Sequence, residues 1–80
     1  MHEAGLCVSL VELAERHADA AGAARIVSVG VAVGDLSGVV PEALALAFPL
    51  CAAGTRADGA ALRIERIAGR DFLLRDLEVE

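Results

Sequence analysis

Near the start of the chain, aliphatic residues recur every three or four positions, which is the spacing of one face of a helix. The residues that follow this spacing are Leu6, Leu10, Leu13, Ala14 and Ala21. Gly22 comes next, and glycine is common just past the end of a helix because it tolerates left-handed backbone angles. The pattern predicts a helix over residues 6–21.

A strict alternation follows over residues 25–34 and predicts a strand. One face is formed by β-branched residues, namely Val27, Val29, Val31 and Val33. The opposite face is mostly small and uncharged, with Ile26, Ser28, Gly30 and Ala32. Two interpretations stay open for this second face, a contact surface or a lightly exposed sheet face. The lack of a continuous apolar patch favours the exposed face.

A second helix is predicted to begin at Pro41, since proline suits the first turn and Glu42 complements the helix dipole there. Its apolar stripe consists of Leu44, Phe48 and Cys51. Pro49 removes one backbone hydrogen bond inside a helix, so we expect a kink or an early end near Phe48.

Two further strands are predicted over residues 61–67 and 71–79, close enough in sequence to form a hairpin. The alternation changes phase within the last one, which predicts a β-bulge near Arg75 and Asp76. The order helix, strand, helix, strand, strand predicts an α+β fold, with two helices packed on a small three-stranded mixed sheet. The whole chain, residues 1–80, is expected to be a single domain.

Composition excludes several classes of function. The formal net charge is −5, Lys is absent and only two residues are aromatic, so the chain lacks the basic footprint of a nucleic-acid-binding protein. No apolar run approaches a membrane span, and no signal peptide is evident. We therefore expect a cytoplasmic protein, with Cys7 and Cys51 as reduced thiols packed in the interior.

Catalytic motifs are equally absent from the sequence. The serines have no nucleophile elbow or identifiable base, and there is no phosphate-binding GxxxxGK[ST] loop. The spacing of Gly30 and Gly34 does not match a dinucleotide fingerprint. The sequence predicts a protein that is not an enzyme.

The first three residues carry the strongest candidate chemistry. The α-amine of Met1, the backbone nitrogen of His2 and the His2 imidazole form chelate rings around one cation, and a backbone nitrogen or the carboxylate of Glu3 completes the set. Square-planar, nitrogen-rich sites favour Ni(II) or Cu(II). The alternative is a solvated chain end without a ligand. His17 is expected to be an ordinary helical histidine.

The ordered series of motifs resembles the HypA/HybF family of nickel-insertion accessory proteins. The matching segments are residues 1–3 (MHE), 11–15 (VELAE), 34–44 (GDLSGVVPEAL), 61–65 (ALRIE) and 77–80 (LEVE). The first and third of these are the most specific. The resemblance covers nearly the whole chain.

This resemblance implies a nickel metallochaperone for [NiFe]-hydrogenase maturation that binds Ni(II) through Met1, His2 and Glu3. It also implies two partners, a maturation GTPase and the hydrogenase large subunit, and a domain of two helices and three strands. The alternative is an interaction or assembly module, with a possible homodimer, that keeps the fold and partner surface without delivering metal.

Two departures from the family pattern stand out. The family normally carries a zinc domain with two CxxC motifs between its last two strands, whereas here only three residues separate Ile67 from Asp71. The zinc domain is therefore expected to be absent, and no structural zinc is expected. Val40 also replaces the acidic residue that commonly precedes the proline, so a carboxylate near the nickel site is missing.

Overall fold

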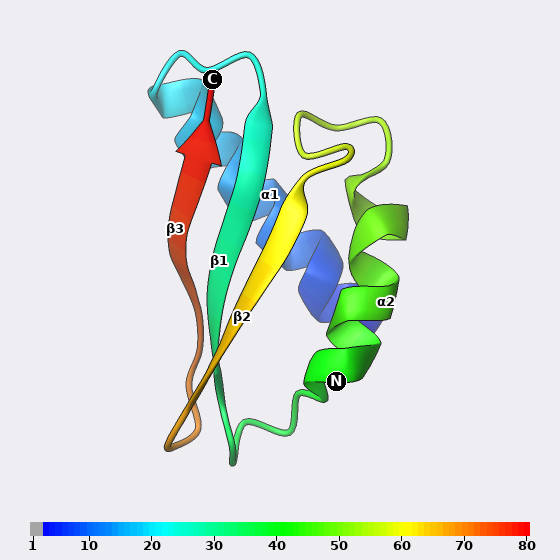
Figure 1. Ribbon diagram of the computed structural model, residues 1–80, viewed down its shortest axis with the longest axis vertical. Helices are drawn as coiled ribbons and strands as arrows, with labels where there is room; N and C mark the ends of the chain where they lie inside the picture. The colour runs from blue at the N-terminus through cyan, green and yellow to red at the C-terminus, as the bar shows by residue number, and fades with distance from the viewer. Residues whose placement is uncertain (1–2) are drawn as a thin grey trace.

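The computed structural model describes residues 3–80 and shows five elements arranged in two layers (Figure 1). They are α1 (Glu3–Ala20), β1 (Ile26–Gly34), α2 (Pro41–Ala52), β2 (Ala61–Ile67) and β3 (Phe72–Val79). Both helices lie on the same side of a single mixed sheet. The predicted α+β class and element order are confirmed.

The sheet has the order β2-β1-β3, with β1 parallel to β2 and antiparallel to β3. The valine-rich strand β1 lies in the centre of the sheet. It is buried along most of its length, as interior strands are. The predicted hairpin of the last two strands is wrong, since β1 lies between them. The β2–β3 connection instead crosses the end of β1, where the backbone amide of Gly34 donates to the Asp71 carbonyl at 2.7 Å.

The predicted β-bulge in the last strand is confirmed. Gly30 is opposite Asp76 and Val31 is opposite Leu74, which leaves Arg75 as the extra residue on β3. This shift lets Leu74 and Leu77 both face the helices although three positions separate them, as their packing against the core shows.

A second irregularity at the start of β1 was not predicted. Ile26 is opposite Val79 and Ser28 is opposite Glu78, so Val27 has no partner of its own. Ile26 is fully buried and Val27 is 41% exposed. The prediction that Val27 shares a face with the other valines is therefore wrong.

The core lies between the sheet and the two helices. It consists of apolar side chains from all elements, with Leu10, Val11, Ala14, Ile26, Val29, Val31, Val33, Leu44 and Phe48 among its buried members. Helix α1 begins three residues before the predicted start and ends at Ala20, one residue before the predicted end. Gly22 follows it as the expected stop, with a φ of 68°. The amide of Gly22 donates to the Asp19 carbonyl and that of Ala23 to the Ala18 carbonyl, the two bonds of a Schellman motif.

Helix α2 does not end near Phe48, so the predicted early end is wrong. It continues through Pro49 to Ala52. Phe48 and Ala52 are buried against the core, while Pro49 is exposed. Packing of the buried face thus outweighs the one backbone hydrogen bond that proline removes.

The small-residue face of β1 is covered rather than exposed. Ser28 is 3% exposed, and its hydroxyl donates to the Glu78 carboxylate and accepts from Arg63. A Cβ added at Gly30 would lie 2.5 Å from Asp76 Oδ1. Both interpretations of this face are therefore wrong: charged side chains of β2 and β3 fold over it and form an ion-pair cluster.

Among residues 3–80, neither helix combines the length and hydropathy needed to cross a bilayer.

Candidate metal centre

Of the three predicted metal ligands, only Glu3 is among the described residues; Met1 and His2 lie outside them. Glu3 is the first residue of α1. Its carboxylate oxygen Oε2 accepts a hydrogen bond of 3.1 Å from the backbone amide of Val40. Val40 directly precedes α2. The structure therefore joins the first residue of one helix to the residue before the other, although 37 positions separate them.

The N-terminus of α2 explains why a carboxylate is stable at this place. Val40 occupies the N-cap position in an extended conformation, with no side-chain hydrogen bond to the helix. Its carbonyl accepts from the Leu44 amide at 3.0 Å, which is the first bond of the helix. The partial positive charge at a helix N-terminus attracts carboxylates. Glu3 supplies one from outside the helix and bonds the backbone amide of the N-cap residue itself.

A second carboxylate lies in the first turn of α2. Glu42 accepts a 2.9 Å hydrogen bond from Arg66 of β2. Its own backbone amide and the charge of Arg66 lower the pKa of the Glu42 carboxyl. Glu42 is therefore ionised at neutral pH and fastens α2 to the edge of the sheet.

The loop before Val40 has a fixed conformation. The Ser37 hydroxyl accepts from the Val39 amide at 3.2 Å, and the Ser37 amide donates to the Gly34 carbonyl at 3.0 Å. Asp35 Oδ1 accepts from the Gly69 amide at 3.0 Å. The GDLSG motif thus holds the loop against the β2–β3 connection and positions Val40 beside Glu3. The turn-forming residues of this motif predict a connection between β1 and α2, which is what the structure shows, but they do not predict these hydrogen bonds.

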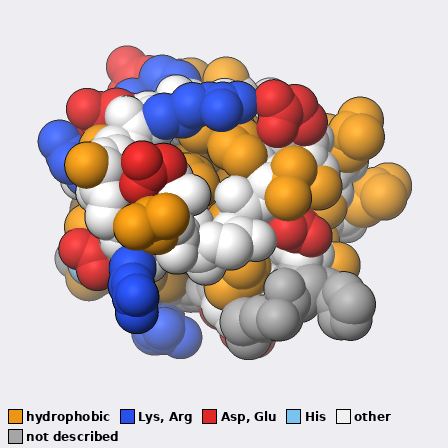
Figure 2. Space-filling view, turned by 90° about the horizontal axis from the view of Figure 1, so that it is seen from below, with side chains coloured by type: hydrophobic (Ala, Val, Ile, Leu, Met, Phe, Trp, Pro, Cys, Tyr) orange, Lys and Arg blue, Asp and Glu red, His pale blue; other side chains and the backbone are white. Residues whose placement is uncertain are grey.

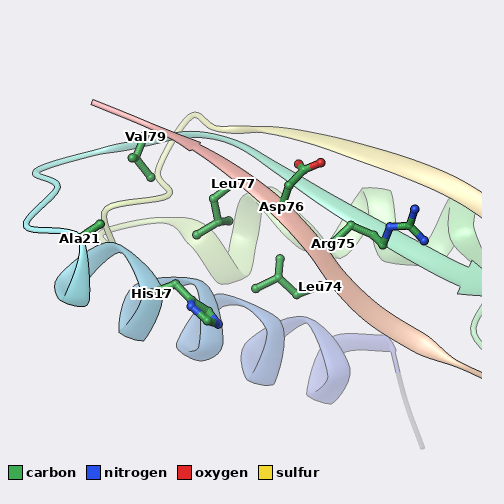
Figure 3. A pocket seen from close by; sticks show the side chains of 7 residues that line it. All are labelled: His17, Ala21, Leu74, Arg75, Asp76, Leu77 and Val79. Carbon is green, nitrogen blue, oxygen red and sulfur yellow. The ribbon is translucent and has the colours of Figure 1, made fainter.

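A cavity of about 340 Å³ lies elsewhere, between α1 and β3 (Figure 3). Leu74 and Leu77 point from β3 toward α1, and His17 approaches them from the helix. The wall is mainly apolar, with His17 and Asp76 as its only residues of a metal-ligating type. Within residues 3–80, no group of three or more His, Cys, Asp or Glu side chains is arranged to hold a metal.

Comparison of the sequence with known proteins assigns the chain to a protein family. Residues 1–72 match the model of the family described as "Hydrogenase/urease nickel incorporation, metallochaperone, hypA". The chain belongs to the HypA family. The match includes residues 1–3 and the loop and helix start at residues 34–44, the two segments that the Glu3–Val40 hydrogen bond joins.

Individual HypA proteins agree with this assignment. The chain is 46% identical over 70 residues to the hydrogenase maturation factor HypA of Geobacter sulfurreducens, covering 88% of this chain and 61% of that protein. It is 51% identical over 69 residues to HypA of Deinococcus radiodurans, covering 86% and 58%. The chain thus matches about three fifths of the length of these relatives, both of which are hydrogenase maturation factors by name.

The solution structure of the Ni metallochaperone HypA from Helicobacter pylori has the same fold. The TM-score is 0.76 at 20% sequence identity, over 100% of this chain and 87% of that chain. Because this identity is low, the likeness supports the architecture and not individual site residues.

Proposed function

We propose that this HypA-family chain binds one Ni(II) ion as cargo through its N-terminal segment and delivers it during [NiFe]-hydrogenase maturation. The donors are the α-amine of Met1, the backbone nitrogen and imidazole of His2, and a fourth donor from Glu3. Membership of a nickel-incorporation family is the observation that carries this proposal. The nitrogen-rich donor set suits Ni(II).

The Glu3 carboxylate supports the proposal by its position. It bonds the Val40 amide, so it anchors the residue that follows His2 to the N-terminus of α2. We infer that Glu3 contributes a backbone nitrogen to the metal, while its carboxylate orients the segment. A site at the chain end, formed on one fixed residue, suits a protein that must bind and then release its cargo.

Delivery requires partners, which we infer from the family to be a maturation GTPase and the hydrogenase large subunit in the cytoplasm. The chain acts as a carrier in this scheme and catalyses no reaction. Its acidic character, with a net charge of −5, attracts divalent cations.

We further propose that the chain is a single domain without the family's zinc domain. Residues 68–71 connect β2 to β3 directly across the end of β1. The only cysteines are Cys7 and Cys51, and neither belongs to a CxxC pair. Metal analysis of the purified protein tests this point: no stoichiometric zinc is expected, and one bound zinc per chain would contradict it.

The amine ligand gives a direct test of the nickel site. Calorimetric titration of Ni(II) into the chain with a free α-amine is expected to show one bound ion, with affinity that rises with pH as the amine and imidazole lose protons. The same chain acetylated at the α-amine keeps every side chain and is expected to lose this binding. Equal binding by both forms would contradict the proposal.

A second candidate function is an assembly module that dimerises without delivering metal. Leu46 and Leu50 on α2 are 79% and 81% exposed, and Figure 2 shows hydrophobic side chains gathered on the side of the molecule where α2 lies. Such an exposed patch is typical of an interaction surface. Light scattering coupled to size-exclusion chromatography separates the candidates: a monomer that binds nickel supports the first, and a dimer without nickel binding supports the second.

A further inference from the structure

The cysteines Cys7 and Cys51 lie next to each other where α1 packs on α2. The Cys51 thiol donates a hydrogen bond to the Ala4 carbonyl, with an S···O distance of 3.8 Å. Ala4 and Cys7 are three positions apart in α1 and therefore share a helix face. This contact places the sulfur of Cys51 against the turn of α1 that carries Cys7. Both cysteines are free thiols.

The two thiols differ in their access to solvent. Cys7 is fully buried in the core, whereas Cys51 is only partly buried. Burial raises the pKa of the Cys7 thiol to about 12, and the neighbouring Cys51 thiol adds to the shift. Cys7 therefore stays protonated near neutral pH and reacts slowly by itself. A reagent from solution reaches Cys51 first.

We propose that Cys7 and Cys51 form a dithiol modification site that closes to an intramolecular disulfide by exchange with a small disulfide of the glutathione class. In the first step, the Cys51 thiolate attacks one sulfur of the reagent. The reagent's S–S bond breaks, one thiolate leaves and takes up a proton, and Cys51 carries a mixed disulfide. In the second step, Cys7 loses its proton and its sulfur attacks that of Cys51, which releases the second small thiol. The protein loses two hydrogens and the reagent gains them.

The disulfide fastens α1 to α2 close to the anchored residue Glu3. Cys51 no longer donates to the Ala4 carbonyl once its sulfur is oxidised, so the first turn of α1 responds to the redox state. This inference goes beyond the proposed nickel function and does not depend on it, because the test below contains no metal.

The experiment treats the full metal-free chain with excess oxidised glutathione at about pH 8, where small thiols exchange readily. Intact mass without reductant is expected to fall by two hydrogens, with no glutathione retained. The thermal midpoint is expected to rise by about 10 °C, because a cross-link between distant residues restricts the unfolded chain. Dithiothreitol should reverse both changes.

Two matched variants test the order of the steps. Cys7→Ala is expected to retain one glutathione on Cys51, since no resolving thiol remains. Cys51→Ala is expected to stay unmodified over the same period, because Cys7 is buried.

The wild-type mass measurement decides the proposal even if a variant fails to fold. A lasting glutathione adduct on the wild-type chain, or a disulfide-linked dimer, would overturn it. Equal modification rates for the two variants would overturn the assigned order.

Discussion

The carboxylate of Glu3 and the backbone amide of Val40 form a 3.1 Å hydrogen bond that connects the starts of the two helices. This bond fixes the Glu3 side chain, at the first described residue of α1, against the N-terminus of α2. The metal ligands proposed here precede or include Glu3, so this one interaction relates them to the rest of the fold.

Substitution of Glu3 tests the anchor. Glu3→Ala removes the acceptor for the Val40 amide and a negative charge from the first turn of α1. The free energy of unfolding is expected to fall by about 1 kcal/mol, as for a partly exposed hydrogen bond of this kind. Urea denaturation measures the change. Glu12→Ala, an exposed position later in α1, serves as the control and should change stability much less. Equal losses would show that Glu3 is not an anchor.

Two substitutions of Val40 separate the effect of helix capping from the effect of an added carboxylate on metal binding. It occupies an N-cap position without a side-chain bond, so Val40→Asp and Val40→Asn should both stabilise the protein by about 1 kcal/mol. Asp also places a carboxylate beside Glu3, and we expect it to raise nickel affinity by about tenfold. Asn should leave the affinity unchanged. A similar gain for both variants would mean that capping alone, and not the added charge, tightens the site.

The crossing of the β2–β3 connection over β1 depends on Gly34. A Cβ at this position would lie 2.4 Å from the Gly69 carbonyl oxygen, and backbone on both sides limits relief. Gly34→Ala is therefore expected to lower the free energy of unfolding by about 3 kcal/mol.

Gly5→Ala is the matched control, because a Cβ there meets nothing within 4 Å and the residue is helical. It should stabilise the protein by about 0.5 kcal/mol. A neutral Gly34→Ala would contradict the tight crossing.

The ion-pair cluster on the outer sheet face gives a pH-dependent contribution. The hydrogen bond from Arg63 lowers the pKa of Asp76 below its usual 3.8. As pH falls toward 3.8, the Asp76 carboxyl takes up a proton in the unfolded state before it does so in the folded state. The contribution of Asp76 is thus full above about pH 5 and is lost as pH falls through the lowered pKa.

The variant Asp76→Asn should show less loss of stability on acidification from about pH 5 than the wild type does, measured by urea denaturation at each pH. Arg70→Gln, at an exposed position outside the cluster, is the control. Identical pH profiles for Asp76→Asn and wild type would exclude the proposed linkage.

Local patterns in the sequence predicted most of the fold. The helix stop at Gly22 and the bulge at Arg75 depend on nearby residues, so periodicity and turn chemistry were sufficient to locate them. The strand order depends on which strand is buried on both faces. That burial is set by tertiary packing and not by the residues near the strand in sequence. The hairpin prediction failed for this reason, since proximity in sequence favoured β2 beside β3.

The remaining errors also have tertiary causes. The bulge at Val27 depends on pairing with β3, and the continuation of α2 through Pro49 depends on burial of Phe48. For the candidate site, the sequence identified Glu3 but gave no signal that its carboxylate bonds a backbone amide 37 positions away. The donor in this contact is a backbone amide, a group that nearly every residue has, so the type of residue at position 40 gives no indication of it.

The most direct test of the nickel proposal compares the two histidines of the chain. Ni(II) is titrated calorimetrically into wild type, His2→Ala and His17→Ala. The proposal predicts one bound nickel for wild type and for His17→Ala, because His17 lies near the end of α1 beside β3. His2→Ala should show no binding of comparable affinity. Undiminished binding by His2→Ala, or its loss in His17→Ala, would contradict the N-terminal site.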